Sequence, residues 1–195
     1  MDPHIWDYLF DENGKGKYCD FPREDLVTYV PFKINGCKNG TIFHLGGDYE
    51  VELIHLPGHT PGHSAFLDKK NRILIGGDVI CVGELGIGGP RPENPYSGRY
   101  ATVEGLRNEL VKLIARKDEF DCMFPGHGPV ELGTIVLDNV LEACDKVLAD
   151  PWNPDCIVEY ERHGRKIRTL NKQIYLSGYL RYNEKSVYME NIAEK

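Results

Sequence analysis

Strand-like segments dominate the stretch from Thr41 to Ile80. The segments "TIFHL" and "YEVELIHL" flank the turn residues Gly46-Gly47-Asp48, and the segments "HSAFLD" and "RILIGGDVI" flank the polar turn "DKKN". Alternating apolar residues on either side of such turns predict two successive β-hairpins. A sheet built from these hairpins must bury one apolar face against another layer, which restricts the chain to layered architectures.

Helical patterns follow the strands. The segment "TVEGLRNELVKLIARKD" places Thr102 at a capping position and repeats apolar residues at helical spacing. That apolar stripe consists of Leu106, Leu110, Leu113 and Ile114. A short strand, "FDCMF", leads to a second predicted helix over roughly residues 131–149. Strands followed by helices predict an α+β fold over residues 1–150.

The last 45 or so residues change character. Residues 151–195 predict two more hairpins, one turning at His163-Gly164 and one within "GYLRYNEKSVYME", so we expect a β-rich C-terminal extension. Five tyrosines of this tail either pack on the core or form a cover or a dimer contact, since tyrosine is enriched at interfaces. These tyrosines are Tyr160, Tyr175, Tyr179, Tyr182 and Tyr188.

Bulk properties narrow the possible partners. The 195 residues carry a formal net charge of −7, which argues against nucleic acid or an anionic membrane as the main partner and leaves a small-molecule substrate open. No apolar run approaches the roughly 18 residues of a membrane-spanning helix, and the first ten residues do not resemble a signal peptide. Six scattered cysteines without a C-x-x-C pair are typical of a reduced, cytoplasmic protein.

The segment "LPGHTPGHSAFL" contains histidines at helical spacing but cannot be a helix. His55, His59 and His63 are four residues apart. However, Pro57 and Pro61 each lack a backbone N–H and disfavour helical geometry in the preceding residue. We therefore predict a tight loop between two strands, in which the three imidazoles need not converge.

Three polar residues stand where a strand-like segment gives way to a glycine-rich loop. They are His59, Asp78 in "GGDVI" and His127 in "FPGHGP". A rigid strand end can hold a side chain in place, as a metal ligand requires, and two imidazoles with a carboxylate suit zinc. Each residue alone has a common structural explanation, because such positions also favour turn and capping residues. The same reasoning predicts that His63 is structural and fixes the loop.

In their order along the chain, "HTPGHS", "GGDVI" and "PGHGP" closely resemble the second half of the metallo-β-lactamase superfamily, nearest to its glyoxalase II-like and lactonase-like hydrolases. The resemblance implies an αββα sandwich, of which residues 1–150 would be the C-terminal portion. It also implies that His59 binds one zinc ion, that Asp78 bridges two and that His127 binds the second. The implied reaction is hydrolysis of a thioester, lactone or similar carbonyl by a metal-bound hydroxide.

An earlier family motif, H-x-H-x-D-H, has no counterpart in this sequence, which contains no H-x-H at all. We therefore expect an incomplete metal site that binds at most one zinc ion weakly, with no catalytic residue assigned. The glycine- and proline-rich loop 83–99 is expected to line the substrate site, with Tyr96 and Arg99 as substrate contacts.

The missing motif also suggests that one sheet of the family sandwich is absent. The remaining sheet would then expose an apolar face bearing Val51, Leu53, Ile73 and Ile75, so we expect a homo-oligomer or pairing with a separate N-terminal half. Two alternatives to a hydrolase remain open at this stage. One is a non-catalytic remnant or interaction module, and the other is a metal-free protein in which the three polar residues only hydrogen-bond within loops.

Overall fold

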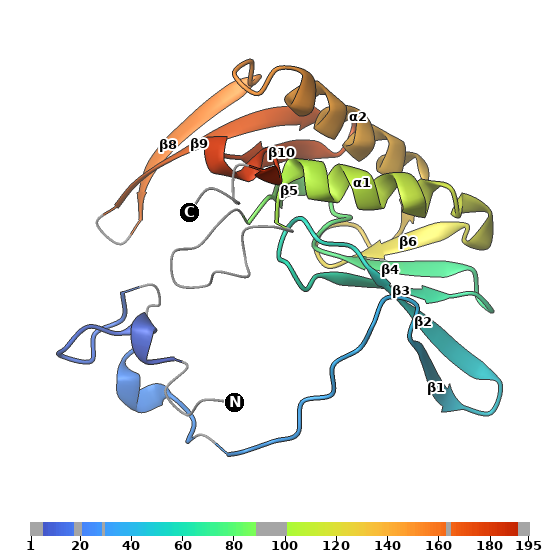
Figure 1. Ribbon diagram of the computed structural model, residues 1–195, viewed down its shortest axis with the longest axis horizontal. Helices are drawn as coiled ribbons and strands as arrows, with labels where there is room; N and C mark the ends of the chain where they lie inside the picture. The colour runs from blue at the N-terminus through green and yellow to red at the C-terminus, as the bar shows by residue number, and fades with distance from the viewer. Residues whose placement is uncertain (1–5, 18–20, 29, 89–100, 163–164, 191–195) are drawn as a thin grey trace. The chain divides into compact units, whose positions relative to one another are not determined.

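A computed structural model describes residues 6–17, 21–28, 30–88, 101–162 and 165–190 of the chain (Figure 1). These residues form two compact units. The first combines residues 1–37 with residues 160–167, and the second combines residues 38–159 with residues 168–195. The first unit contains two short 3-10 helices, η1 (Asp7–Leu9) and η2 (Arg23–Asp25). In this unit the rings of Phe10 and Phe21 pack edge to face, with centroids 5.9 Å apart.

The second unit is built on a six-stranded sheet. In spatial order its strands are β1 (Ile42–Gly46), β2 (Tyr49–His55), β3 (Ser64–Asp68), β4 (Ile73–Gly77), β6 (Cys122–Pro125) and β7 (Leu132–Gly133). The first four strands are antiparallel, β4 and β6 are parallel, and β7 is antiparallel to β6 at the far edge. Both hairpins predicted between Thr41 and Ile80 are present.

A second sheet joins the tail to the middle of the chain. Its strands in spatial order are β5 (Gly83–Gly86), β10 (Gly178–Tyr182), β9 (Arg165–Ile174) and β8 (Cys156–Arg162). The strands β8 and β9 are neighbours as predicted, but the predicted hairpin within "GYLRYNEKSVYME" is wrong. Asn183 instead caps a 3-10 turn, η4 (Glu184–Ser186), through a reciprocal pair of hydrogen bonds with Ser186. Instead of pairing with the segment that follows it, β10 pairs in parallel with β5.

The division of the chain at residue 150 into a family domain and a β-rich extension stays a prediction. In the structure, the strands that follow this position share a sheet with β5. Of the tail tyrosines, Tyr182 is buried and donates to Pro151 O, and Tyr188 donates to Leu148 O, so both pack on the second unit. Tyr175 and Tyr179 are exposed.

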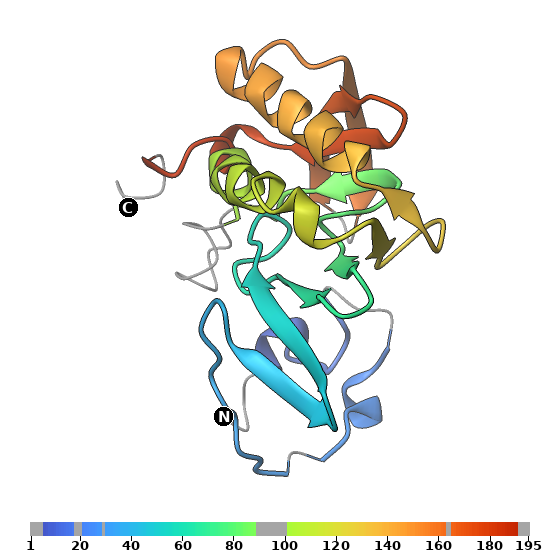
Figure 2. The same ribbon diagram turned by 90° about the vertical axis from the view of Figure 1, so that its right-hand side faces the viewer.

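Two helices, α1 (Val103–Ile114) and α2 (Ile135–Ala149), lie side by side (Figures 1 and 2). Thr102 caps α1 by accepting from Gly105 N–H, as predicted. The predicted start of α2 near residue 131 is four residues too early, because Leu132 and Gly133 pair with β6 as β7. Among the described residues, no helix is both long enough and apolar enough to cross a membrane.

The hydrophobic core lies between the helices and both sheets. Leu106, Leu110 and Leu113 of the predicted α1 stripe are buried, whereas Ile114 is partly buried. The six-stranded sheet contributes Leu67, Leu74 and Met123, and the four-stranded sheet contributes Leu85, Leu170 and Leu180 to the same cluster. These layers of helix and sheet establish the predicted α+β class.

The opposite face of the six-stranded sheet carries an apolar row that the helices do not cover. Leu53 pairs with Phe66, Phe66 with Ile75, and Ile75 with Phe124 across four successive strands, so all four side chains leave the same face. Leu53, Phe66 and Phe124 are partly exposed, and Ile75 is 45% exposed. We call Leu53, Phe66, Ile75 and Phe124 the outer apolar row.

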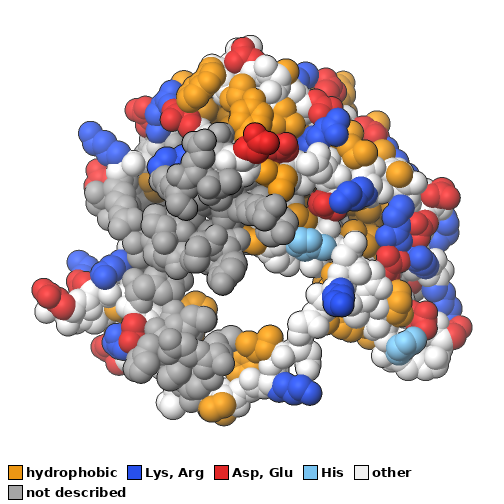
Figure 3. All heavy atoms as spheres, viewed as in Figure 1, with side chains coloured by type: hydrophobic (Ala, Val, Ile, Leu, Met, Phe, Trp, Pro, Cys, Tyr) orange, Lys and Arg blue, Asp and Glu red, His pale blue; other side chains and the backbone are white. Residues whose placement is uncertain are grey.

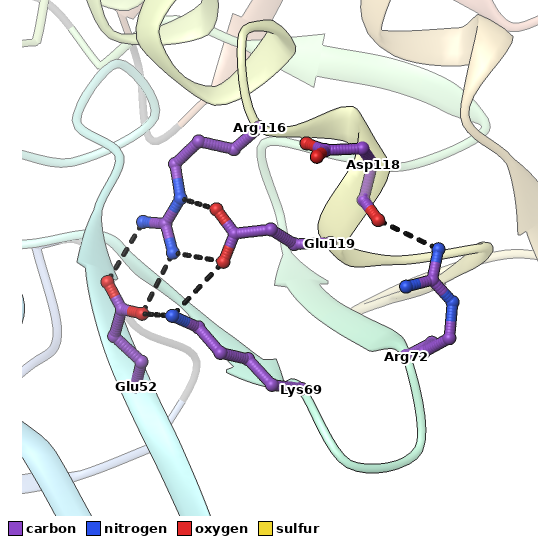
Figure 4. A network of polar contacts seen from close by, with 6 residues as sticks. All are labelled: Glu52, Lys69, Arg72, Arg116, Asp118 and Glu119. Atoms are coloured by element: carbon purple, nitrogen blue, oxygen red, sulfur yellow. Dashed lines mark hydrogen bonds and ion pairs between the residues drawn. The ribbon is translucent and has the colours of Figure 1, made fainter.

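Charged side chains connect strand β2 to the segment that follows α1. Basic and acidic side chains lie interspersed over the coloured part of the surface in Figure 3. One such group is drawn in Figure 4, where Arg116 donates to both carboxylate oxygens of Glu52 at 2.9 and 2.8 Å and to those of Glu119 at 2.5 and 2.9 Å. Lys69 adds ion pairs to the same two carboxylates at 3.0 and 3.1 Å.

Candidate metal centre

The loop between β2 and β3 is closed by its own backbone and by two histidines. Leu56 N donates to His63 O at 2.9 Å, which brings the two ends of the loop together. His55 Nε2 lies 2.8 Å from Pro61 O, so this imidazole donates to the loop backbone. The segment is a loop rather than a helix, as the prolines predict.

His63 connects this loop to the end of β4. Its Nδ1 lies 3.0 Å from Leu56 O, a carbonyl that can only accept, so Nδ1 carries the proton. Its Nε2 then accepts from Asp78 N–H at 3.0 Å. Burial lowers the pKa of His63, which favours the neutral ring that this pair of hydrogen bonds needs. The predicted structural role of His63 is therefore confirmed.

His59 is held by the edge of β5. Its Nδ1 lies 2.8 Å from Gly86 O, so Nδ1–H donates and Nε2 keeps its lone pair in the neutral ring. That lone pair faces Asp78 Oδ2 at 3.6 Å. Two acceptors that face each other repel unless a proton or a metal ion lies between them. An imidazole whose other nitrogen donates to a carbonyl is also how proteins orient histidine ligands of metals.

Asp78 lies between the two candidate histidines. Its Oδ1 is 3.3 Å from His127 Nε2, while its Oδ2 faces His59. The side chain fits there because residue 126 is a glycine, whose hypothetical Cβ would lie 2.3 Å from Asp78 Oδ1. Asp78 and His59 are each a little over one-third exposed, and His127 is 74% exposed, so the group opens to solvent.

These three residues fit a metal ion in chemistry and in pairwise spacing. Two ligands about 2.0–2.2 Å from a tetrahedral zinc ion lie roughly 3.3–3.6 Å from each other, which matches both separations. Each histidine faces a different oxygen of Asp78, however, and no three donors among the described residues form a ready group for one ion. Zinc ligation by His59, Asp78 and His127 thus stays a prediction, and Asp78 lies between the two histidines.

The two predicted substrate contacts cannot be placed. Tyr96 and Arg99 lie outside the described residues, as does most of the predicted substrate loop 83–99. The described part of that loop, residues 83–88, begins with β5 and reaches His59 through Gly86. Sequence reasoning missed this supporting role of Gly86, because a backbone carbonyl leaves no signature in the residue types.

Comparisons with known proteins indicate the same superfamily as the order of the motifs does. A family model described as the metallo-beta-lactamase superfamily matches residues 3–127. The hydroxyacylglutathione hydrolase GloC of Haemophilus influenzae is 32% identical over 91 residues, covering 47% of this chain and 39% of that protein. The acyl-coenzyme A thioesterase MBLAC2 of Homo sapiens is 32% identical over 90 residues, covering 46% of this chain and 29% of that protein.

Among solved structures, a metallo-beta-lactamase family protein from Thermus thermophilus is similar with a TM-score of 0.46 and 18% identity, covering 61% of this chain and 35% of that one. The chain thus spans 29% to 39% of the length of the two curated relatives named above. The family model covers well over half of the chain and includes His59, Asp78 and His127. The chain belongs to the metallo-β-lactamase superfamily.

Proposed function

We propose that this chain carries part of the metal site of a hydrolase that cleaves thioesters. The observation that carries the proposal is the orientation of His59, whose Nδ1 donates to Gly86 O and whose Nε2 faces a carboxylate oxygen of Asp78 at 3.6 Å. A metal ion between Nε2 and this oxygen would be bound by both. The similarity to a hydroxyacylglutathione hydrolase and an acyl-coenzyme A thioesterase favours a thioester as substrate, since both named substrates are thioesters.

The roles of the chain's own residues follow from their contacts. His59, Asp78 and His127 would hold zinc, which when bound supplies a Lewis acid and a water molecule of lowered pKa. Gly86 O fixes the tautomer of His59, and His63 fixes the backbone of Asp78. The overall reaction adds water to the thioester carbonyl carbon, breaks the C–S bond and releases a carboxylic acid and a thiol.

The sequence limits how tightly this chain binds the ion. A catalytic zinc usually has three protein ligands, and the chain lacks the H-x-H-x-D-H segment that family members add. We therefore expect one weakly bound ion and little or no turnover from the 195 residues alone.

The test is a zinc titration of the purified chain, with thioester and lactone hydrolysis measured in parallel. Weak binding should fall at least about tenfold in each of the variants His59→Ala, Asp78→Ala and His127→Ala. His44→Ala is the matched control, because His44 is an exposed histidine paired with Glu50 on the β1–β2 hairpin. Zinc binding that survives all three site substitutions would refute the assignment. Tight stoichiometric zinc with turnover would refute the expectation of an incomplete site.

The outer apolar row favours a second candidate function, an interaction module. An uncovered apolar face on a sheet is a typical association surface. In that case the chain would bind a second copy, or a separate N-terminal half, through this face without forming a metal site. The two candidates separate in the titration above, since a pure interaction module has no zinc binding that depends on these residues.

A further inference from the structure

The outward face of the four-stranded sheet contains an arginine next to the candidate metal centre. Arg181 of β10 pairs in register with Gly86 of β5, and its guanidinium lies against that glycine. A Cβ on residue 86 would be 3.1 Å from Arg181 Nη2, so the glycine makes room for the guanidinium. Gly86 is also the residue whose carbonyl holds His59. The guanidinium and the imidazole therefore contact the same residue.

Within the described segments, the guanidinium of Arg181 has one acidic side-chain partner. Nη1 lies 2.6 Å from Glu84 Oε1, and within the described part of the chain the guanidinium makes no other side-chain contact. The side chain is 34% exposed, so Nε and Nη2 can reach a ligand. An arginine with a free edge binds carboxylate or phosphate through two parallel N–H donors.

A second, independent feature on this face is an acceptor without a donor. Asn171 of β9 pairs directly with Arg181, so both side chains leave the same face of the sheet. Asn171 is only 8% exposed, and its Oδ1 has no hydrogen-bond partner among the residues that the structure describes. Buried acceptors are nearly always paired, so an unpaired one beside an exposed cation suggests a missing N–H or O–H group.

We infer that Arg181 and Asn171 bind the thiol portion of the substrate, and that this portion carries both an anionic group and an amide N–H. The inference rests on the proposed thioester hydrolysis. The anion would lie on the free edge of Arg181, the amide would donate to Asn171 Oδ1, and the thioester carbonyl would extend past Gly86 toward His59. A thiol of tripeptide length spans roughly 10 Å when extended, which suits two sites that share one residue.

Glutathione and coenzyme A both combine an anionic group with amides, and they differ in the anion. Glutathione offers carboxylates, whereas coenzyme A offers phosphates. The shared requirement is a bidentate acceptor for a guanidinium, and the choice between the two thiols is an outcome of the experiment.

The experiment is calorimetric titration of the full 195-residue chain with glutathione and, separately, with coenzyme A. Binding of at least one thiol is expected, and Arg181→Ala should weaken it by about 10- to 100-fold, the range for losing charge-assisted hydrogen bonds. Arg181→Lys should recover only part of the loss, since an ammonium lacks the planar fork. Glu84→Gln should tighten binding, because it removes the carboxylate that competes for the guanidinium.

Arg168→Ala is the matched control. Arg168 lies on β9 of the same sheet and also pairs with glutamates, Glu159 and Glu184, so its loss should leave thiol binding unchanged. Thermal melts show whether each variant is folded. If Arg181→Ala does not fold, thiol binding by Arg181→Lys is compared with thiol binding by the wild type. Failure of both thiols to bind, or equal binding by the wild type and both Arg181 variants, overturns the inference.

The binding measurement does not depend on the metal or on turnover. A chain that binds a thiol through Arg181 but never hydrolyses its thioester, even with a completed metal site, would refute the proposed function and support the thiol site. Thioester hydrolysis combined with thiol binding that does not change when Arg181 is substituted would support the proposed function and refute the thiol site.

Discussion

At the scale of single residues, the candidate centre depends on backbone positions as much as on its polar side chains. Gly77 precedes Asp78 and has a φ of +55°, a conformation that residues with a Cβ rarely adopt. A Cβ at this position would also lie 2.6 Å from His63 Nε2, the atom that accepts from Asp78 N–H. The glycine therefore allows both the turn after β4 and the approach of His63.

We expect Gly77→Ala to lower the free energy of unfolding by about 2–4 kcal/mol, through backbone strain and displacement of His63. Any zinc binding by Asp78 should fall with it. Gly62→Ala is the control, since Gly62 lies in the neighbouring loop with open space at its Cβ position, and it should change stability by no more than about 0.5 kcal/mol. Chemical denaturation of both variants measures the difference, and equal effects would contradict this account.

At the scale of elements, Arg116 connects the end of α1 to strand β2. Its side chain is 28% exposed, and its guanidinium donates to both carboxylate oxygens of Glu52 and of Glu119 (Figure 4). Glu52 is only 13% exposed, so removing its partner leaves a largely desolvated carboxylate with Lys69 alone. This network differs from the exposed pair of Arg107 and Asp145 on the two helices.

Arg116→Ala should therefore destabilise the fold by about 1–3 kcal/mol, the range for charge-assisted hydrogen bonds that are partly buried. Arg107→Ala should cost about 0–1 kcal/mol, as is typical of exposed ion pairs. Urea denaturation of the two variants under the same buffer conditions makes the comparison. A larger loss for Arg107→Ala would show that the network in Figure 4 does not fasten α1 to the sheet.

The same network predicts a pH dependence. Hydrogen bonds from Arg116 lower the pKa of Glu119 to about 2 from its ordinary value of 4.5, and they also lower the pKa of Glu52. The unfolded chain then binds more protons than the folded chain over this range, so stability falls as the pH drops from about 4.5 toward 2. In Arg116→Ala the loss between these pH values should be smaller. Thermal melts at pH steps from about 6 to about 2 measure it, and parallel curves for the two proteins would contradict the assignment.

At the scale of the whole chain, the outer apolar row is an apolar sheet surface that the helices of the described second unit do not cover. Leu53 and Ile75, predicted from the sequence to need a covering surface, lie in this row, and Val51 and Ile73 leave the same face two positions along their strands. Leu170 and Ile174 of β9 and Leu180 of β10 are buried in the helix-side core. Covering a few hundred Å² would contribute on the order of 10 kcal/mol, which exceeds the lower estimates of the cost of association.

We therefore expect the isolated 195-residue chain to form a homodimer or a larger assembly through this face. Light scattering during size-exclusion chromatography gives the mass, and Phe66→Lys or Ile75→Glu should shift it to the monomer. Val111→Glu is the control, because Val111 is an exposed apolar residue of α1, away from this row. A wild-type chain that is monomeric and melts cooperatively would refute the expectation.

The sequence by itself determined the local structure of this protein. Pro57 and Pro61 exclude a helix through chain geometry, turn residues set both hairpins between Thr41 and Ile80, and Thr102 begins α1. These outcomes depend on contacts within a few residues, so they can be read along the chain. The motif order also identified the superfamily and the three candidate ligands.

Tertiary structure alone decided which distant groups meet. The pairing of β10 with β5, the role of Gly86 O in holding His59 and the position of Arg181 on Gly86 all join residues far apart in sequence. The predicted hairpin after residue 178 failed for the same reason, since the edge of β5 competes with any local partner for the backbone of β10. Backbone groups are identical in every residue except proline, so the strand that satisfies them is chosen by packing in three dimensions rather than by residue type.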